Sequence, residues 1–295
     1  MASPARYAFA ALIAANIVLA AGPWMVRLAD VGPIAAGFWR LAIALPFLVW
    51  LAAVQMRGKP LPAWPLVGAV ALGGLFFAAD LGAWHEGILR TKLANATLFG
   101  NFASFIFALY GFVVLRALPR PLQLFALLLA AAGAALLLGR SYDVSPEHFI
   151  GDLLCIAAAI FYALYLIAVD RARRQLASWP VLAIATAAGA LPILLAALAM
   201  GETVLPGDWT PLILLSIGSQ LIGQGLLVFA MGHLPPLVVG VGLLTQPVVS
   251  AAIGWAVYRE RLTLADGVGA LLVCAALVLI RLPARGVATP AAPAQ

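Results

Sequence analysis

The chain has 295 residues, of which 65% are hydrophobic and 9% charged, and its formal net charge is +6. A soluble domain carries about 25% charged residues, so this composition excludes a surface that faces only water and predicts an integral membrane protein. The basic residues stand singly or in small groups between apolar runs, without interleaved aromatic residues, which is not the pattern of a nucleic-acid-binding surface.

Ten apolar segments follow one another along the chain, each near the length of about 20 residues that a helix needs to cross a hydrocarbon core. Clusters of charges and helix breakers, such as Arg57-Gly58-Lys59-Pro60, predict short loops between them. We therefore predict an all-α membrane protein of ten transmembrane helices. The predicted spans are 7–22, 33–55, 64–84, 92–115, 121–139, 149–169, 179–200, 210–230, 235–257 and 264–281.

The two ends of the chain differ from the spans. Arg6 ahead of an apolar run resembles the start of a signal peptide, but Asn16 interrupts the run and many spans follow, which favours a retained first helix. The Ala/Pro-rich tail 283–295 is predicted to be disordered. Cys155 and Cys274 lie inside apolar runs, so we interpret them as buried thiols and not as a disulfide or metal pair.

The basic residues predict the orientation. With the N-terminus inside, ten Lys and Arg residues fall in the inner loops and tails, six fall in the outer loops, and Arg40 falls within a span. Because Lys and Arg accumulate on the cytoplasmic side, we expect both termini in the cytoplasm.

An internal repeat appears when the sequence is shifted by 145 residues. The aligned pairs include Trp64 with Trp209, Gly73 with Gly218, Gly87 with Gly232, Arg116 with Arg261, and Asn101 with Gln246. Chance matching of abundant Leu and Ala is the alternative, and it does not account for these residue types. We predict five-helix repeats over 1–139 and 140–282; because five is odd, the second repeat is inverted, as is typical of secondary transporters with a substrate site near the membrane midplane.

Polar groups inside a lipid-embedded bundle are costly and usually face a cavity or a partner. Helical spacing places Phe77, Asp80 and Trp84 on one face, and Gln220 and Gln224 on another. Carboxamides with aromatic rings suit a small zwitterion that has an apolar side chain. The candidate substrate-binding residues are Asn16, Trp39, Phe77, Asp80, Trp84, His85, Asn101, Phe161, Tyr162, Tyr165, Gln220, Gln224 and Gln246.

Each candidate also has a structural interpretation. Asn and Gln side chains often join transmembrane helices, and aromatic side chains often belong to the core or the interfacial belt. Arg40 has three alternatives: snorkelling, a structural ion pair with Asp80, which is slightly favoured, or binding a substrate carboxylate. Asp80 and His85 could instead form a proton relay, although both lie near a helix end where water solvates them.

Several enzyme signatures are absent from the sequence. It contains no G-x-x-x-x-G-K-[ST], H-E-x-x-H or G-x-S-x-G motif. We therefore expect no enzymatic activity, cofactor or metal site.

The second half carries a family resemblance. Its motif residues are Gln246-Pro247-Val248, Gly254-Trp255, Tyr258 to Thr263, and Gly267 to Leu271. This pattern resembles the ten-helix EamA-type exporters of the drug/metabolite transporter superfamily, and the polar and aromatic residues are similar to the aromatic amino-acid exporter (YddG-like) branch. The first half departs from it: Asn101-Phe102 stands where the family has a proline, and Leu115 where the second half has Glu260. The resemblance implies export of small metabolites, with amino acids the expected cargo, across a bacterial-type inner (plasma) membrane.

Three other functions remain as alternatives. A transporter of nucleotide-sugars or lipid-linked groups would need several cations in its cavity, whereas Arg40 alone lies within a span. A membrane enzyme would need a third partner beside Asp80 and His85, and a scaffold or receptor would have no use for the repeat. The expected partners are a small-molecule substrate and the lipid bilayer; we expect a monomer and leave a dimer open.

Overall fold

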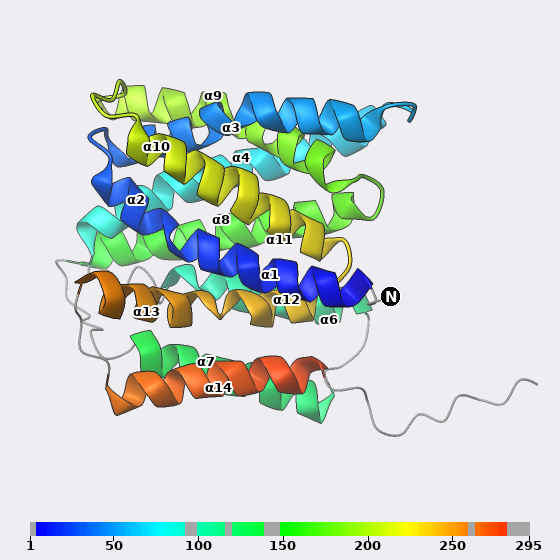
Figure 1. The fold of residues 1–295 in the computed structure, drawn as a ribbon, viewed down its shortest axis with the longest axis vertical. Helices are drawn as coiled ribbons and strands as arrows, with labels where there is room; N and C mark the ends of the chain where they lie inside the picture. Colours follow the sequence, from blue (N-terminus) through cyan, green and yellow to red (C-terminus); the bar gives the residue numbers. More distant parts are fainter. Residues whose placement is uncertain (1–3, 92–98, 116–119, 139–147, 259–262, 282–295) are drawn as a thin grey trace, which may run out of the picture.

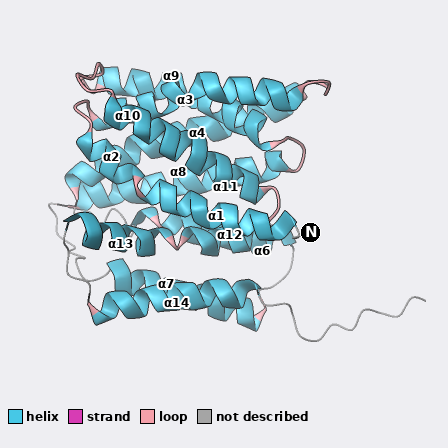
Figure 2. Cartoon of the chain, in the orientation of Figure 1, coloured by secondary structure: helices cyan, strands magenta, loops and turns pink. Residues whose placement is uncertain are grey.

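The computed structural model describes residues 4–91, 99–115, 120–138, 148–258 and 263–281, and within these ranges the secondary structure is helical (Figure 1, Figure 2). Seven stretches are long and apolar enough to cross a membrane, and three shorter apolar helices bring the described spans to the predicted ten. The all-helical, ten-span prediction is confirmed. The predicted tail 283–295 lies outside the described residues.

The helices divide into two sets of five spans, which we call the first and second halves. The first half contains α1 (Pro4–Ala20) continued by α2 (Gly22–Leu28), α3 (Pro33–Met56), α4 (Trp64–Arg90), α6 (Phe102–Leu115) and α7 (Pro121–Leu138). The second half contains α8 (Phe149–Arg173), α9 (Ser178–Ala199), α10 (Thr210–Leu215) with the π-helix η2 (Ser216–Gly223) and α11 (Gln224–Met231), α12 (Pro236–Leu243) with α13 (Gln246–Tyr258), and α14 (Leu264–Arg281).

Several spans extend beyond their predicted ends; α8, for example, continues past the predicted end at residue 169 to Arg173. The first span continues past residue 22 through α2, after a break at Ala21, because Pro23 has no N–H with which to bond the preceding turn. The third span continues past residue 84 to Arg90, where Glu86 and Arg90 form an ion pair one turn apart near the end of the helix. A helix breaker in the first span and polar residues in the third therefore ended these spans too early in the sequence-based prediction.

The helix packing repeats when the two halves exchange roles. Three pairs of equivalent helices pack on each other: α3 with α9, α6 with α12, and α7 with α14. Other contacts also correspond between the halves. The packing of α4 on α8 is matched by the packing of α11 and η2 on α1, and the packing of α4 on α9 is matched by that of η2 on α3. Equivalent helices such as α3 and α9 run in opposite directions (Figure 1). The arrangement is that of two inverted five-helix units.

Small residues permit the closest of these contacts. A Cβ added at Gly133 of α7 would lie 2.6 Å from the Gly269 carbonyl oxygen of α14, and one added at Gly240 of α12 would lie 2.7 Å from the Ser104 carbonyl oxygen of α6. Close backbone approach through Gly is typical of helix pairs in membranes. The pair α7 and α14 lies at one edge of the bundle (Figure 1).

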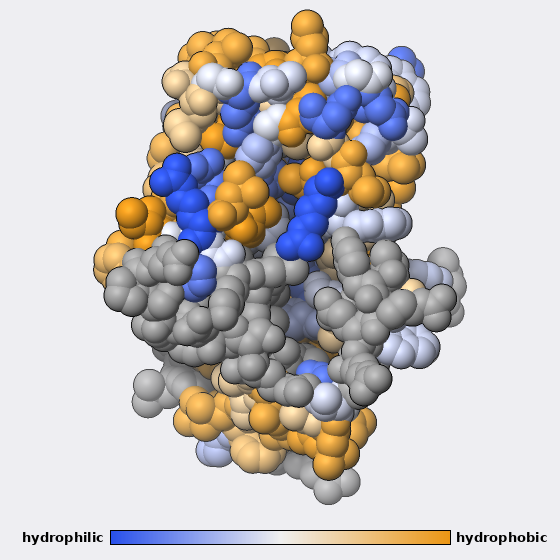
Figure 3. Space-filling view, turned by 90° about the vertical axis from the view of Figure 1, so that its left-hand side faces the viewer, coloured by the Kyte–Doolittle hydropathy of each residue, from blue (hydrophilic) through white to orange (hydrophobic). Residues whose placement is uncertain are grey.

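The outer surface of the spans is apolar. Leu128, Leu191 and Leu271 remain 60–70% exposed near the middle of their helices. In Figure 3, hydrophobic side chains cover the flanks of the molecule, while hydrophilic ones gather on the end of the bundle that faces the viewer. This distribution suits helices whose sides contact lipid and whose ends contact water.

Candidate functional site

Side chains from both halves form a polar and aromatic group inside the bundle, which we call the central cluster. Its members are Arg40, Phe77, Asp80, Tyr162, Tyr165, Thr186, Gln220 and Gln224. The described helices place Phe77, Tyr162 and Gln220 about 15–20 Å from either end of their spans at 1.5 Å per residue. The central cluster therefore lies near the membrane midplane.

Hydrogen bonds fix one side of the central cluster. Nε of Arg40 donates to Oε1 of Gln220 at 3.2 Å, and Nε2 of Gln220 donates to the Thr186 hydroxyl at 2.9 Å. The Ser216 hydroxyl donates to the Arg40 backbone carbonyl at 2.9 Å. Gln220 thus holds a cation from the other half with its amide oxygen, while its amide nitrogen is anchored on Thr186 of its own half. The candidate list omitted Thr186, although its position inside an apolar run was a usable signal.

Stacked rings form the other side. The Phe77 and Tyr165 rings lie 4.6 Å apart between centroids, the Tyr162 and Tyr165 rings 5.8 Å apart, and the Arg40 guanidinium carbon lies 5.4 Å from the Phe77 centroid. The Tyr165 hydroxyl donates to Oε1 of Gln224 at 3.3 Å, and Nε2 of Gln224 donates to the Tyr162 hydroxyl at 3.4 Å. The arrangement supplies an aromatic wall with hydroxyl and amide groups at its rim.

The favoured ion pair between Arg40 and Asp80 is not formed. The ion pairs among the described residues are Glu86–Arg90 and Asp170–Arg174, and Arg40 bonds Gln220 instead. Gln220 contacts the Arg40 side chain and Ser216 its backbone carbonyl, whereas Asp80 forms neither a hydrogen bond nor an ion pair with Arg40. In the described part of the chain, no three His, Cys, Asp or Glu side chains gather as metal ligands would.

A second polar group lies between α1 and the break that separates α12 from α13. Nδ2 of Asn16 donates to the Gly242 carbonyl at 2.8 Å, and Nε2 of Gln246 donates to Oδ1 of Asn16 at 3.2 Å. The Thr245 hydroxyl also donates to the Gly242 carbonyl, at 2.7 Å. Asn16 is fully buried, whereas Gln246 is half-buried. This group therefore joins the halves at a discontinuous helix, a feature that often borders transporter sites.

Asn101 and Gln246 occupy matching places in the fold. Gln246 is the first residue of α13, and half-buried Asn101 directly precedes α6. Each carboxamide thus stands where the fourth span of its half resumes as a helix. The two lie on helices that pack against each other, α6 and the α12–α13 span.

Besides Asn16, Asn101 and Gln246, four candidates lie outside the central cluster: Trp39, Trp84, His85 and Phe161. Trp39 donates from Nε1 to the Val204 carbonyl at 2.7 Å and packs edge-on against Trp209, near the loop between α9 and α10. Phe161 stacks on Phe76 at 6.4 Å, and half-buried Trp84 lies 5.5 Å from the His85 ring.

The His85 ring is held by the start of α3. Its Nδ1 lies 2.6 Å from the Pro33 carbonyl oxygen, and the ring is buried against Gly37, where an added Cβ would lie 3.5 Å from it. Asp80 is not among the hydrogen-bond partners of this imidazole. The geometry supports packing of α3 on α4 more than a direct Asp80–His85 relay.

The sequence analysis did not foresee the π-helix η2. Such segments are rare and often occur at functional sites, and η2 carries Gln220. Ser219 within it is buried, and its hydroxyl has no hydrogen-bond partner. This hydroxyl faces Gly22, where an added Cβ would lie 3.0 Å away, so η2 meets α1–α2 at the break in the first span.

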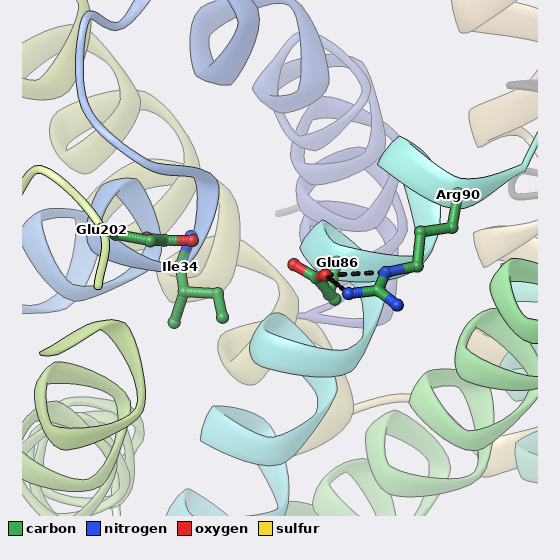
Figure 4. Close-up of polar contacts among 4 residues, drawn as sticks. All are labelled: Ile34, Glu86, Arg90 and Glu202. Carbon is green, nitrogen blue, oxygen red and sulfur yellow. Dashed lines mark hydrogen bonds and ion pairs between the residues drawn. The ribbon is translucent and has the colours of Figure 1, made fainter. Parts of the chain in front are cut away.

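Loops of the two halves are joined at the predicted outer end. Oε1 of Glu202 accepts a hydrogen bond from the Ile34 N–H group at 3.2 Å, and the two residues lie close together in Figure 4. Oε2 of Glu202 accepts from the Ala35 N–H group at 2.7 Å, so Glu202 caps α3. Asp30 accepts from the Gly207 N–H at 2.7 Å. Hydrogen bonds from Thr210 lower the pKa of Asp208 in the same loop.

The chain is similar to known proteins in its fold and in its sequence family. A solved structure described only as "Crystal structure of protein" is similar, with a TM-score of 0.81 and 20% sequence identity over 95% of this chain and 99% of that chain. This likeness concerns the fold alone. No curated protein matches the chain. The model of the EamA-like transporter family matches twice, over residues 6–139 and 149–282, once in each half. The chain belongs to the EamA-like transporter family, within the drug/metabolite transporter superfamily.

Proposed function

We propose that the protein is a secondary transporter that exports small amphipathic metabolites, most of all amino acids and among them aromatic ones, by alternating access. The observation that carries the proposal is the central cluster, which both halves build near the midplane. Inverted halves of similar structure can exchange roles, and this gives inward- and outward-open states of similar energy. The family match supports transport, and the cluster supports the cargo.

The chemistry of the cluster matches an amino acid. The stacked Phe77, Tyr162 and Tyr165 rings suit an apolar or aromatic side chain, and Gln220 and Gln224 suit polar groups. Arg40 is the only cationic member, whereas a nucleotide-sugar or lipid-linked phosphate would be expected to need several cations. The charge distribution of the loops supports both termini in the cytoplasm of a cell with a bacterial-type inner membrane.

Flux from liposomes tests this function. Purified protein in liposomes preloaded with labelled amino acids should release them faster than protein-free liposomes, with aromatic amino acids among the best. No flux above the protein-free level for the whole panel would remove the cargo assignment. Running the assay with and without a pH gradient distinguishes proton exchange from uncoupled transport.

Substitutions at the matching carboxamides refine the site. Asn101→Leu and Gln246→Leu should each reduce flux while the protein stays folded, because each removes a polar group from the border between the halves. Exposed Gln175 provides the matched control, and Gln175→Leu should leave flux unchanged. Unchanged flux in the first two variants would exclude those residues from the site.

A further inference from the structure

Two opposite charges inside the bundle lack direct partners. Arg40 donates only through Nε, so both of its Nη atoms are without hydrogen bonds, and the Asp80 carboxylate accepts none. The two groups are farther apart than the 4.0 Å limit of an ion pair. Both side chains are half-buried within spans. Among the described residues, the only fully buried side-chain nitrogen or oxygen atom without a hydrogen bond is the Ser219 hydroxyl, so the unbonded atoms of Arg40 and Asp80 are not fully buried. The Nη atoms and the carboxylate oxygens therefore each keep some accessible surface.

Unpaired charges at such a depth need a compensating partner. An ionised side chain within a membrane protein is costly unless it is paired, and intramembrane ionisable residues mark substrate pathways by default. A pair that served only the fold would close to ion-pair distance. Here the Arg40 guanidinium bonds Gln220 instead of closing on Asp80.

The geometry prepares the two charges for one ligand. Gln220, itself held by Thr186, fixes the Arg40 guanidinium over the Phe77 ring, with its two Nη atoms unoccupied. Asp80 follows Phe77 by three residues on α4, which places both side chains on the same face of the helix. The Arg40 guanidinium and the Asp80 carboxylate thus both lie near the Phe77 ring. The two Nη groups of a guanidinium can bind both oxygens of a carboxylate.

We propose that the α-carboxylate of a zwitterionic amino acid binds the Arg40 Nη atoms, that its ammonium binds Asp80, and that its side chain lies along Phe77 and Tyr162. Charge-assisted hydrogen bonds of about 2.7–2.9 Å at each end let the zwitterion bridge groups that do not reach each other. This assignment rests on the proposed function and makes it specific for ligands that carry both charges. Amines and carboxylic acids with the same side chain satisfy only one end.

Binding of three probes to the purified full-length protein tests the bridge. The probes are phenylalanine, phenethylamine, which lacks the carboxylate, and hydrocinnamate, which lacks the ammonium. Each missing charge should weaken binding about tenfold to a hundredfold relative to phenylalanine, because hydrogen bonds to charged groups carry that much affinity.

Two variants give the decisive pattern. Arg40→Gln should weaken phenylalanine and hydrocinnamate but not phenethylamine, and Asp80→Asn should weaken phenylalanine and phenethylamine but not hydrocinnamate. A purely structural role would weaken all three probes together, and that result would overturn the bridge. The variants Glu86→Gln and Arg90→Gln, which remove charges from a pair on the same helix outside the cluster, should change none of the affinities.

Failure of the bridge and failure of the proposed function can be told apart. Amino-acid flux that persists with unchanged affinity in Arg40→Gln and Asp80→Asn contradicts the bridge alone. Absence of both phenylalanine binding and amino-acid flux in the unaltered protein contradicts the proposed function and the bridge together. A monodisperse chromatographic profile in detergent identifies the variants that keep their fold. The Arg40→Lys variant, which keeps the charge without the planar guanidinium, should retain part of the affinity.

Discussion

The Arg40 guanidinium of α3 donates a 3.2 Å hydrogen bond to the Gln220 carboxamide of η2, which joins the two halves near the middle of the bundle. The Gln220 amide nitrogen in turn donates a 2.9 Å hydrogen bond to the Thr186 hydroxyl. A cation is thereby held by neutral groups, which leaves its charge uncompensated within the protein. The proposed transport function depends on this arrangement.

Loss of Gln220 should impair transport more than folding. Gln220→Leu removes the partner of Arg40 and leaves the Thr186 hydroxyl without its donor, so the guanidinium is free to take other orientations. We expect amino-acid flux in liposomes to fall about tenfold or more, in line with the affinity carried by a hydrogen bond to a charged group. Gln220→Glu is informative beside it, because a carboxylate would pair with Arg40 and compete with the substrate. Wild-type flux in both variants would contradict the role given to this contact.

Ser219 should be dispensable for stability. Its hydroxyl is buried without a hydrogen bond, and such a group costs about 1 kcal/mol or more. Ser219→Ala should therefore leave the protein equally stable or up to about 1 kcal/mol more stable, which is measurable by thermal unfolding in detergent. A clear loss of stability in Ser219→Ala would contradict this prediction.

Glu202 should stabilise the outer end more than the neighbouring surface pair does. It caps α3 through two backbone N–H groups, and loss of a cap costs about 1 kcal/mol. The Glu86–Arg90 pair is solvent-exposed on the Arg90 side and should contribute less than about 0.5 kcal/mol. Thermal unfolding of Glu202→Gln and Glu86→Gln checks the order of the two effects, and the reverse order would contradict it.

The orientation can be tested with single cysteines. In a background with Cys155 and Cys274 replaced by Ser, Lys59→Cys and Asp208→Cys place thiols in exposed loops at opposite ends of the bundle. A membrane-impermeant maleimide added to intact cells should label position 208 and not position 59, since the positive-inside pattern puts residue 59 in the cytoplasm. Labelling of position 59 alone would reverse the orientation.

The sequence predicted the spans well because the bilayer imposes a length and an apolar composition on each of them. Its errors at span ends lay where a span continues past a breaker, as at Pro23, or past polar groups, such as Glu86 and Arg90. The repeat was also readable, because matched Trp and Gly residues preserve a shared packing pattern, as at Gly73 and Gly218.

The candidate site was less predictable. Helical spacing placed Gln220 and Gln224 on one face, and both reach the central cluster. The predicted pairing of Arg40 with Asp80 was wrong, and Arg40 bonds Gln220 instead. The depth and rotation of α3 relative to η2 decide this, and they follow from helix packing that residue spacing does not encode. The same limit applies to Trp39, which lies against Val204 of a loop. No residue type is specific for a π-helix, so the sequence could not predict η2.

Counterflow in proteoliposomes tests the central claim most directly. Liposomes that contain the protein and are loaded with unlabelled phenylalanine should take up external labelled phenylalanine transiently above equilibrium, and Arg40→Gln and Asp80→Asn should abolish that overshoot. The account predicts the overshoot in the unaltered protein and in Glu86→Gln. Labelled phenylalanine that enters at the same rate with and without internal phenylalanine, and equally in protein-free liposomes, would contradict it.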